Sequence, residues 1–374
     1  MKHILYSLLI LFSLGACTSY TDKPLMKIRQ NPPTKKISKL DIESFQLESI
    51  ESSYIGEITL TRDSIYFIDK RFCWVFSFDT NGHFQNRYLG QGAGPSEIET
   101  GIIEGCAIMP NQCVFMGGGR DCYVYDSKFN RQSKFIAGFD KQDTREGYEA
   151  PYIYTLCYNN LQLKTFGNHI YINMVVEHPD FNFFTKPDEH FDKGHYLMKI
   201  NIDTQEAEAM LGKYPPLYIK NDNFRQFSFV NFDIDTKGNF YISFEADSLI
   251  YKYDKNFMPQ YAYGYEGRAM EKCAQSFSSP QEFRKHYMEN RNTYGYYSSL
   301  KYIEEQNMLF RGYIKSKKAE TDGLQIYHND ILIGDIDTPK GFKVIGYSSP
   351  YYYGTSPIDE DNETITIYRF KLPE

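Results

Sequence analysis

Most of the chain after residue 36 consists of short apolar or alternating segments separated by turn-forming residues. The clearest example is residues 65–89, in which residues 65–69, 74–78 and 84–89 each have the pattern of a β-strand. The letters DTNG at residues 79–82 supply the turn between the second and third of these strands. The pattern predicts a β-meander. Because one meander has an apolar face that it cannot bury alone, further units must pack against it.

Similar units recur to the end of the chain. They cover residues 106–139, 163–211, 232–263, 300–336 and 341–372. The alternating segment KISKLDIESFQL, residues 36–47, stands before the first complete unit. In propellers such an early strand completes the last blade and removes an exposed edge. We therefore predict an all-β fold, a six-bladed β-propeller whose ring is closed by an N-terminal strand.

One helical insertion interrupts the predicted strands. Ser279, Pro280 and Glu282 have the order of an N-cap, a first helical residue and the third residue of a capping box. The apolar residues that follow predict a short helix to about residue 292. Since it lies between two blades, we expect this helix at one end of the propeller.

The N-terminus has the pattern of an export signal. Lys2 and His3 precede an apolar run too short to span a bilayer. The run ends in Leu-Gly-Ala-Cys at residues 14–17, which resembles the bacterial lipobox, so Cys17 is expected to carry the lipid anchor. An ordinary signal peptide with a chance cysteine is the alternative. The predicted organisation is a signal peptide at 1–17, a polar flexible tether at 18–35 and the propeller at 36–374.

Three short segments of the first unit carry a family resemblance. The strand at residues 65–69, the turn at 78–84 and the loop GQGAGPSE at 90–97 resemble the first blade of the TolB-like six-bladed β-propeller lipoproteins of Bacteroidetes. The loop in that family usually reads G-x-G-P-G-E, whereas here the spacing is altered and Ser96 replaces a glycine. The resemblance implies the propeller fold and a cell-envelope location. The family has no common activity, so the resemblance implies none here.

The net charge, the residue after Cys17 and the cysteine spacing each exclude or favour a property of the protein. The net charge of −7 argues against a nucleic-acid surface, which needs clustered Lys and Arg, and we expect no nucleic acid. Thr18 is not the Asp that favours retention at the inner membrane, so an outer-membrane location is expected. The six cysteines after Cys17 have no CxxC pair and are expected to be small buried side chains. A disulfide within Cys106, Cys113 and Cys122 is the alternative.

The glycine-rich loop at residues 90–97 is the strongest local motif. It lacks the third glycine of a dinucleotide-binding fingerprint and the lysine of a phosphate-binding P-loop. We interpret Gly90, Gly92, Gly94, Pro95 and Glu97 as a blade-crossing loop. There the glycines allow positive φ and Glu97 accepts hydrogen bonds from backbone N–H groups.

Metal-ligating residue types gather in the insertion that follows residue 176. The candidate ligands are Glu177, His178, Asp188, His190 and His195. Their oxygen and imidazole groups suit a divalent cation such as Ca²⁺, but neither HExxH nor EF-hand spacing is present. A solvated polar hairpin explains the same residues, and we expect no cofactor. A nucleophile elbow of the G-x-S-x-G type is also absent from the sequence.

Two serines match a modification pattern. Ser64 and Ser248 lie within Asp-Ser-aliphatic triplets, which resemble the O-glycosylation sequon of exported Bacteroidetes proteins. Both are expected to be exposed at turns that enter strands. The alternative is that Asp63 and Asp247 only stabilise their turns through side-chain hydrogen bonds.

Tyrosine-rich segments at residues 287–302 and 351–353 are flanked by Gly and Ser, a composition found in adaptable binding surfaces. The alternative is that these rings fill the space between blades. We interpret the chain as a binding propeller for a protein, peptide or glycan ligand rather than as an enzyme. The alternative class is a metal-dependent hydrolase or lactonase-like propeller, which would show convergent Asp, Asn, Glu or His side chains at the channel mouth.

Overall fold

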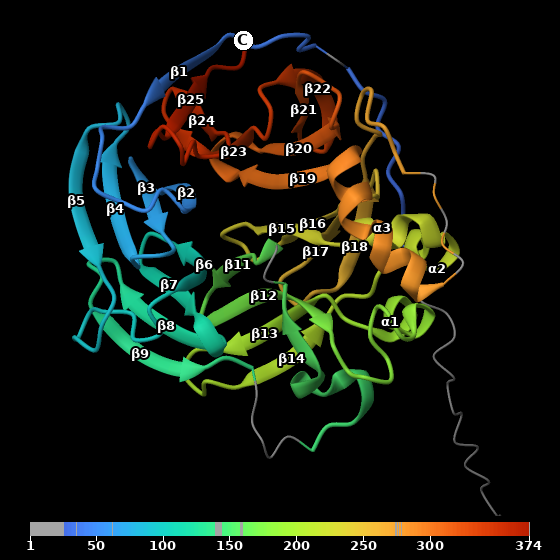
Figure 1. Cartoon of the computed structure of the whole chain (residues 1–374). Coiled ribbons are helices and arrows are strands. Elements are labelled where there is room, and N and C mark those ends of the chain that lie inside the picture. The colour runs from blue at the N-terminus through green and yellow to red at the C-terminus, as the bar shows by residue number, and fades with distance from the viewer. Residues whose placement is uncertain are drawn as a thin grey trace, which may run out of the picture.

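The computed structural model describes residues 26–34, 36–61, 63–138, 144–157, 160–273, 275, 277 and 279–373. Six antiparallel sheets surround a central channel as the blades of a propeller (Figure 1). Each blade begins with the strand nearest the channel and continues outward through hairpins. The predicted fold class is confirmed.

The first three blades contain the following strands. Blade 1 has β2 (Gly56–Thr61), β3 (Ser64–Asp69), β4 (Trp74–Asp79) and β5 (Phe84–Leu89). Blade 2 has β6 (Ile103–Ile108), β7 (Gln112–Gly117), β8 (Asp121–Asp126) and β9 (Arg131–Ile136). Blade 3 has β10 (Tyr154–Leu156) and β11 (Leu163–Phe166), which both pair with β12 (His169–Val176), and then β13 (Leu197–Asn201) and β14 (Ala207–Leu211).

The other three blades complete the ring. Blade 4 has β15 (Val230–Ile234), β16 (Phe240–Phe244), β17 (Ile250–Tyr253) and β18 (Pro259–Tyr263). Blade 5 has β19 (Tyr294–Ile303), β20 (Met308–Ser316), β21 (Asp322–His328) and β22 (Ile331–Thr338). Blade 6 has β23 (Lys343–Ser348), β24 (Tyr351–Thr355), β25 (Thr366–Phe370) and β1 (Ile42–Gln46).

The N-terminal strand closes the ring as predicted. β1 pairs antiparallel with β25, with Ile42 opposite Phe370 and Phe45 opposite Ile367, and so forms the outer edge of blade 6 (Figure 1). The strand is shorter than the predicted segment of residues 36–47. Earlier in that segment, Ile37 forms a parallel bridge with Gly334 of β22.

Residues just before the closing strand also lie against the ring. The backbone N–H of Arg29 donates to the carbonyl of Ala262 at 2.8 Å, and that of Thr34 donates to the carbonyl of Leu332 at 3.0 Å. The Arg29 guanidinium lies 3.2 Å from the ring centroid of Tyr261. The predicted tether, residues 18–35, therefore includes residues that are hydrogen-bonded to blades 4 and 5.

Tyrosine and phenylalanine rings fill much of the space between blades. Phe310 of blade 5 packs on Tyr352 of blade 6, with ring centroids 5.0 Å apart. Tyr352, Tyr353 and Tyr297 are all buried. These side chains from the tyrosine-rich segments therefore act in blade packing, which was the alternative to a binding role.

Three α-helices are present in the described part of the chain: α1 (Pro187–Lys193), α2 (Pro216–Lys220) and α3 (Pro280–Thr293). Short 3-10 turns are η1 (Gly118–Arg120), η2 (Gly147–Glu149), η3 (Pro151–Ile153), η5 (Asp222–Phe227) and η6 (Glu304–Gln306). α3 is the predicted helix, and the side chain of Ser279 accepts a hydrogen bond from the backbone N–H of Glu282 as its N-cap. The other two were not predicted. α1 lies where a polar hairpin was expected.

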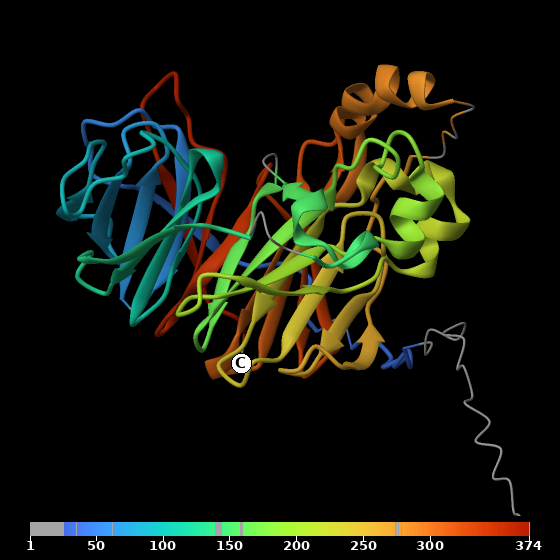
Figure 2. The ribbon, with the colours of Figure 1, turned by 90° about the horizontal axis from the view of Figure 1, so that it is seen from below.

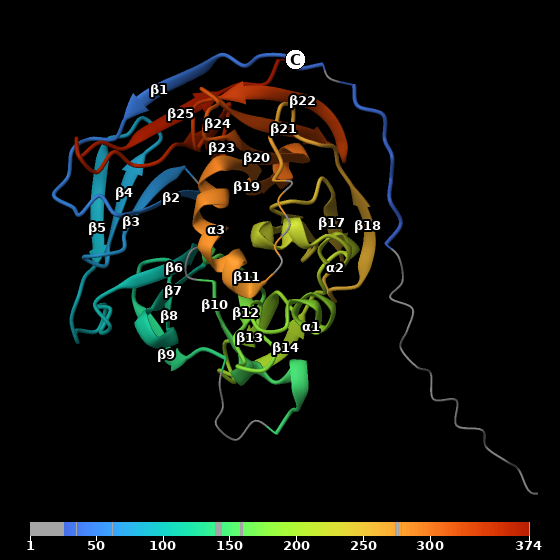
Figure 3. The same ribbon diagram turned by 45° about the vertical axis from the view of Figure 1, so that its right-hand side comes forward.

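The three helices gather at one end of the ring, with α1 and α2 beside blades 3 and 4 and α3 next to β19 of blade 5 (Figures 2 and 3). We call this the helix-bearing end. α3 contacts β19 and η5, and α1 contacts α2, so the helices form a cover on this end. The propeller thus has one end of β-turns and one end built from helices and longer connections.

Candidate functional site

A cavity of about 440 Å³ lies beneath α3 at the helix-bearing end. α1, α3, the segment before β15 and the ends of β10 and β12 surround it. Four aromatic side chains line it: Phe183, Phe184, Phe229 and Tyr287. We call this cavity the α3 pocket. Its volume falls within the range of small-molecule and side-chain binding sites, roughly 300–1,000 Å³.

His190 of α1 contributes a buried polar group to the α3 pocket. Only 1% of the residue is exposed, and its Nδ1 has no hydrogen-bond partner within the described ranges. Burial, with a smaller effect from the positive charge of Arg225, lowers the pKa of His190 to about 3. The imidazole is therefore neutral near pH 7 and offers a ring nitrogen to a ligand.

Two charged side chains of opposite sign also line the α3 pocket. Glu177 follows β12 and Arg284 belongs to α3, and both are exposed. The Arg284 guanidinium stacks over Phe184 at 4.6 Å from the ring centroid. Neither the Glu177 carboxylate nor the Arg284 guanidinium has an ion-pair partner among the residues described. Both charged groups are free to contact a ligand.

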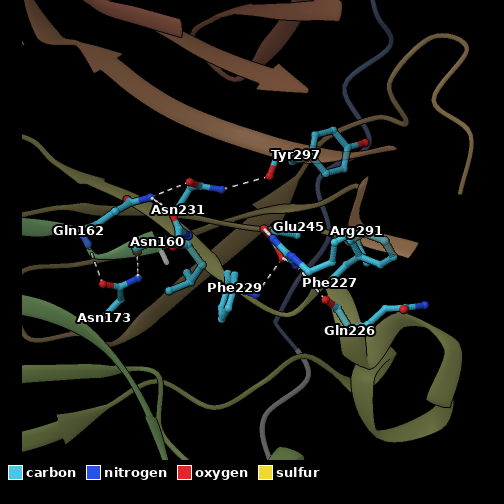
Figure 4. A network of polar contacts seen from close by, with 12 residues as sticks. Asn160, Gln162, Asn173, Gln226, Phe227, Phe229, Asn231, Glu245, Arg291 and Tyr297 are labelled. Atoms are coloured by element: carbon cyan, nitrogen blue, oxygen red, sulfur yellow. Dashed lines mark hydrogen bonds and ion pairs between the residues drawn. The ribbon is translucent and has the colours of Figure 1, made fainter. Parts of the chain in front are cut away.

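A buried ion pair fixes α3 next to this pocket (Figure 4). The Arg291 guanidinium donates two hydrogen bonds to the Glu245 carboxylate, at 2.7 and 2.6 Å. The two side chains are only 15% and 4% exposed. Burial raises the pKa of Glu245, and the Arg291 charge opposes that effect. The N–H of Phe229 donates to the same carboxylate at 3.2 Å, so the pair also positions one wall of the α3 pocket.

A chain of amide side chains continues this network toward the channel (Figure 4). Gln162 donates to Asn231 at 2.6 Å, and Asn231 donates to the carbonyl of Tyr297 at 3.1 Å. Asn173 donates to the carbonyl of Asn160 at 2.6 Å. These bonds join blades 3, 4 and 5, so the amides serve to hold the inner strands in register at the helix-bearing end.

The central channel contains a second group of charged side chains. Two cavities of about 380 and 470 Å³ lie along it, and together they touch the inner strands of all six blades. Asp233 of β15 lies 3.4 Å from the ammonium of Lys164 and 3.4 Å from that of Lys301. The larger cavity is lined by Lys164, Lys301, Lys343 and Glu57, whereas Asp233 lines the smaller one together with Asp235, Glu304 and Glu305. Lysine is thus the main charged residue of the larger cavity, and carboxylates are the main charged groups of the smaller one.

The predicted metal ligands have separate partners. His178 stacks on Phe181 with centroids 3.9 Å apart, and Asp188 forms an ion pair with Arg225 at 2.6 Å. His195 Nε2 lies 3.0 Å from a Glu149 carboxylate oxygen and 2.9 Å from the Lys213 ammonium. Burial, followed by the charge of Lys213, lowers the pKa of His195.

Of the predicted ligands, only Glu177 and His190 line the α3 pocket. No group of three or more His, Cys, Asp or Glu suited to a metal ion occurs in the part of the chain that the structure describes. The structure therefore does not gather the candidate ligands into one site.

The glycine-rich loop lies between β5 and β6, where the chain passes from blade 1 to blade 2. The backbone N–H of Gly94 donates to the Glu97 carboxylate at 2.7 Å. Gly92 has φ of +145°, and a Cβ there would lie 2.1 Å from the same carboxylate. The loop, including Gly90 and Pro95, thus has a compact conformation that depends on glycine.

The remaining predicted site residues have mixed surroundings. Ser64 and Ser248 are half-buried rather than exposed. Asp247 accepts hydrogen bonds from the Leu249 N–H at 2.9 Å and from the Tyr251 hydroxyl at 2.6 Å, as the turn-stabilising alternative predicts. O-glycosylation stays a prediction. Cys17 lies outside the described residues, so its lipidation also stays a prediction.

None of the six described cysteines forms a disulfide, so the alternative disulfide within Cys106, Cys113 and Cys122 is not formed. The Cys106 thiol instead donates to the Glu57 carboxylate at 3.0 Å. Cys73, Cys113, Cys122, Cys157 and Cys273 are buried.

Sequence reasoning missed most of the α3 pocket and the channel lysines. Phe183 and Phe184 were a usable signal, because they belong to a group of four phenylalanines inside a mostly polar insertion. Lys164, Lys301 and Lys343 gave no such signal. They come from three blades and meet only when the ring closes.

Comparison with known proteins identifies the fold alone. No family profile and no curated protein matches the chain. A solved structure of a DUF4221 family member from Bacteroides vulgatus superposes with a TM-score of 0.64 at 13% identity, covering 90% of this chain and 99% of that one. A candidate exported protein from Bacteroides fragilis superposes with a TM-score of 0.52 at 13% identity, covering 93% of this chain and 99% of that one. Within the described residues, no helix is long and apolar enough to cross a bilayer.

Proposed function

We propose that this protein is a binding propeller, anchored in the cell envelope, that takes a protein, peptide or glycan ligand at its helix-bearing end. The α3 pocket is the observation that carries the proposal. It combines aromatic walls with three polar groups that have no hydrogen-bond or ion-pair partner among the described residues: His190 Nδ1, the Glu177 carboxylate and the Arg284 guanidinium. Unpaired polar groups at an aromatic concave site favour a ligand that supplies the missing partners.

The chemistry of the pocket suits an amphipathic group. The aromatic faces of Phe184 and Phe229 would pack against a sugar ring or an apolar peptide side chain. Glu177 and Arg284 would bind polar or charged groups of the ligand, because one accepts and the other donates hydrogen bonds. Neutral His190 would contact the deepest polar atom. No bond in the ligand needs to break for these contacts to form.

The envelope location rests on two supports. The Leu-Gly-Ala-Cys pattern at residues 14–17 resembles a lipobox, which places a lipid anchor on Cys17. The fold is similar to that of a candidate exported protein from Bacteroides fragilis, and the first blade resembles TolB-like lipoproteins. We propose the outer membrane as the site of anchoring.

The proposal is tested by screening the full chain on an array of bacterial envelope glycans and an array of peptides. We expect a ligand whose binding is lost or weakened about tenfold or more by Phe184→Ala and by Arg284→Ala, since each removes a direct contact. Lys285→Ala, at an exposed neighbour of Arg284 on α3, is the matched control and should bind as the unmodified protein does. Ligands that bind all four proteins equally would contradict the α3 pocket as the binding site.

A further inference from the structure

The larger of the two channel cavities has an excess of positive charge, whereas the smaller one is also lined by the carboxylates of Asp233, Asp235, Glu304 and Glu305. Lys164, Lys301 and Lys343 come from β11, β19 and β23 and line the same cavity of about 470 Å³. Glu57 lines it too, and Asp233 contacts two of the lysines. Lys70 lies outside the lining of this cavity, with its ammonium 3.7 Å from the Glu57 carboxylate. Three ammonium groups therefore line this cavity with one carboxylate, and the Asp233 carboxylate contacts two of those three.

Asp233 cannot compensate both of its lysines. Burial acts to raise the pKa of Asp233, but the ammonium groups of Lys164 and Lys301 outweigh burial and leave that pKa low. Asp233 acts to raise the pKa of Lys301, yet burial and the repulsion from Lys164 together leave the pKa of Lys301 below its ordinary value. A single carboxylate shared by two ammonium groups leaves one positive charge in excess.

Lys343 has even less compensation. It is open to the water of the channel, and its ammonium makes no hydrogen bond or ion pair with any described residue. Burial among the surrounding blades lowers the pKa of Lys343, and the attraction of Glu57 does not restore it. An ammonium that lies at the channel wall without a hydrogen-bond or ion-pair partner is stabilised by an anion that enters the channel.

Neutral donors stand beside the lysines. Ser298 and Ser299 line the same cavity, at a bulge of β19 just before Lys301. Their hydroxyls make no hydrogen bonds with the described residues, so both can donate to an anion. The cavity thus combines excess positive charge, free hydroxyl donors and enough volume for a small molecule.

We infer that the channel binds a small dianion carrying carboxylate or phosphate groups, with Lys301 and Lys343 as its charge partners and Ser298 and Ser299 as hydroxyl donors. This site is distinct from the α3 pocket and does not depend on it. The ligand would enter along the propeller axis, where the inner strands of all six blades meet.

The test uses the full chain with its lysines labelled by ¹³C-dimethylation and followed by NMR. The Lys343 signal is assigned by its absence from Lys343→Gln. Inorganic phosphate and succinate are the two probes, with chloride at equal ionic strength as the reference. We expect at least one probe to shift the Lys343 signal saturably and to raise the pKa of Lys343, since a bound anion stabilises the charged form. The exposed Lys318 should respond as it does to chloride.

Variants decide whether the channel is the site. Lys343→Gln should raise the dissociation constant of the probe about tenfold or more, and Lys343→Arg, which keeps the charge, should largely retain binding. Lys318→Gln removes the same charge from the surface and should have no effect. The inference is overturned if neither probe gives a saturable shift, if Lys318 responds as Lys343 does, or if Lys343→Gln binds the probe unchanged.

Discussion

Two histidines of the same insertion show how surroundings decide the role of a residue type. The Nδ1 of each has no hydrogen-bond partner in the described structure, but His190 lines the α3 pocket, whereas the Nε2 of His195 lies between the Glu149 carboxylate and the Lys213 ammonium. The sequence placed both among candidate metal ligands, because spacing alone cannot say which way a side chain points. The partners that separate them come from residues far away in the chain, so they could not be predicted locally.

The buried His190 makes a prediction about acid stability. Its pKa is about 3 in the folded protein and about 6.5 when unfolded, so between these values the unfolded state binds more protons. The contribution of neutral His190 to the free energy of unfolding is therefore fully present above about pH 6.5 and is lost as the pH falls toward 3. At about pH 5 the loss from this group is roughly 2 kcal/mol. His190→Gln should remove that loss, so its free energy of unfolding should fall less between pH 7 and about pH 5.

Urea unfolding at the two pH values measures this difference. His328→Gln, at an exposed histidine, is the control and should keep the pH dependence of the unmodified protein. If His190→Gln loses as much stability on acidification as the unmodified protein does, His190 is not held neutral by its surroundings.

Turns and one helix were predicted correctly from short sequence motifs, because contacts between residues close in the chain stabilise them. The hairpin turns after β4, β8 and β17 each begin with an Asp whose carboxylate accepts two backbone N–H groups of the turn. The capping box of α3 worked in the same way. α1 and α2 were missed because they are too short to show a helical period. The residues that meet in the channel were missed because six separate strands bring them together.

The attachment of α3 depends on the ion pair between Arg291 and Glu245. Arg291→Met should lower the free energy of unfolding by about 3–5 kcal/mol, because it leaves a buried carboxylate without its partner. Chemical denaturation measures this change. Arg284→Met, at an exposed position of the same helix, should cost much less. The double variant Arg291→Met, Glu245→Gln should recover part of the loss. Equal effects of the two single variants would show that the ion pair does not stabilise the attachment of α3.

Three deletions in the N-terminal segment are expected to lower stability by different amounts. Deleting residues 36–47 removes β1 together with the buried side chains of Ile37, Leu40 and Leu47, and should cost about 5 kcal/mol or more. Deleting residues 26–34 removes the hydrogen bonds to blades 4 and 5 and should have a smaller effect. Deleting the polar residues 18–25 should leave the melting temperature unchanged. Equal melting temperatures for the first and last deletions would contradict ring closure by β1 as a source of stability.

At the scale of the whole molecule, the ring separates two kinds of surface. One end carries the helices, the longer connections and the α3 pocket, while the channel through the middle has a larger cavity rich in lysine and a smaller one rich in carboxylates. The propeller itself was predicted from its repeating strands, since each blade repeats the same pattern. The place of α3 at one end was predicted, but α1, α2 and the α3 pocket were not, because they arise from insertions whose residues meet only in the folded ring.

The predicted lipid anchor on Cys17 determines where the whole protein lies in the cell. Cys17→Ala should abolish lipid attachment, so the protein should move from the membrane fraction to the soluble envelope fraction. Cell fractionation and intact mass measure both effects. Cys273→Ala, at a buried cysteine of the propeller, is the control for loss of a thiol. Unchanged membrane fractionation and unchanged lipid mass in Cys17→Ala would contradict the anchor.

Hydrogen exchange can test directly whether the ligand binds at the helix-bearing end. The full chain is measured by mass spectrometry with and without the ligand selected on the arrays. Binding in the α3 pocket should slow exchange in residues 177–190 and 280–293, because these segments would be ordered or covered by the ligand. The turns at residues 79–84 and 126–131 should exchange as before. Protection of those turns with none at 177–190 or 280–293 would contradict ligand binding at the helix-bearing end.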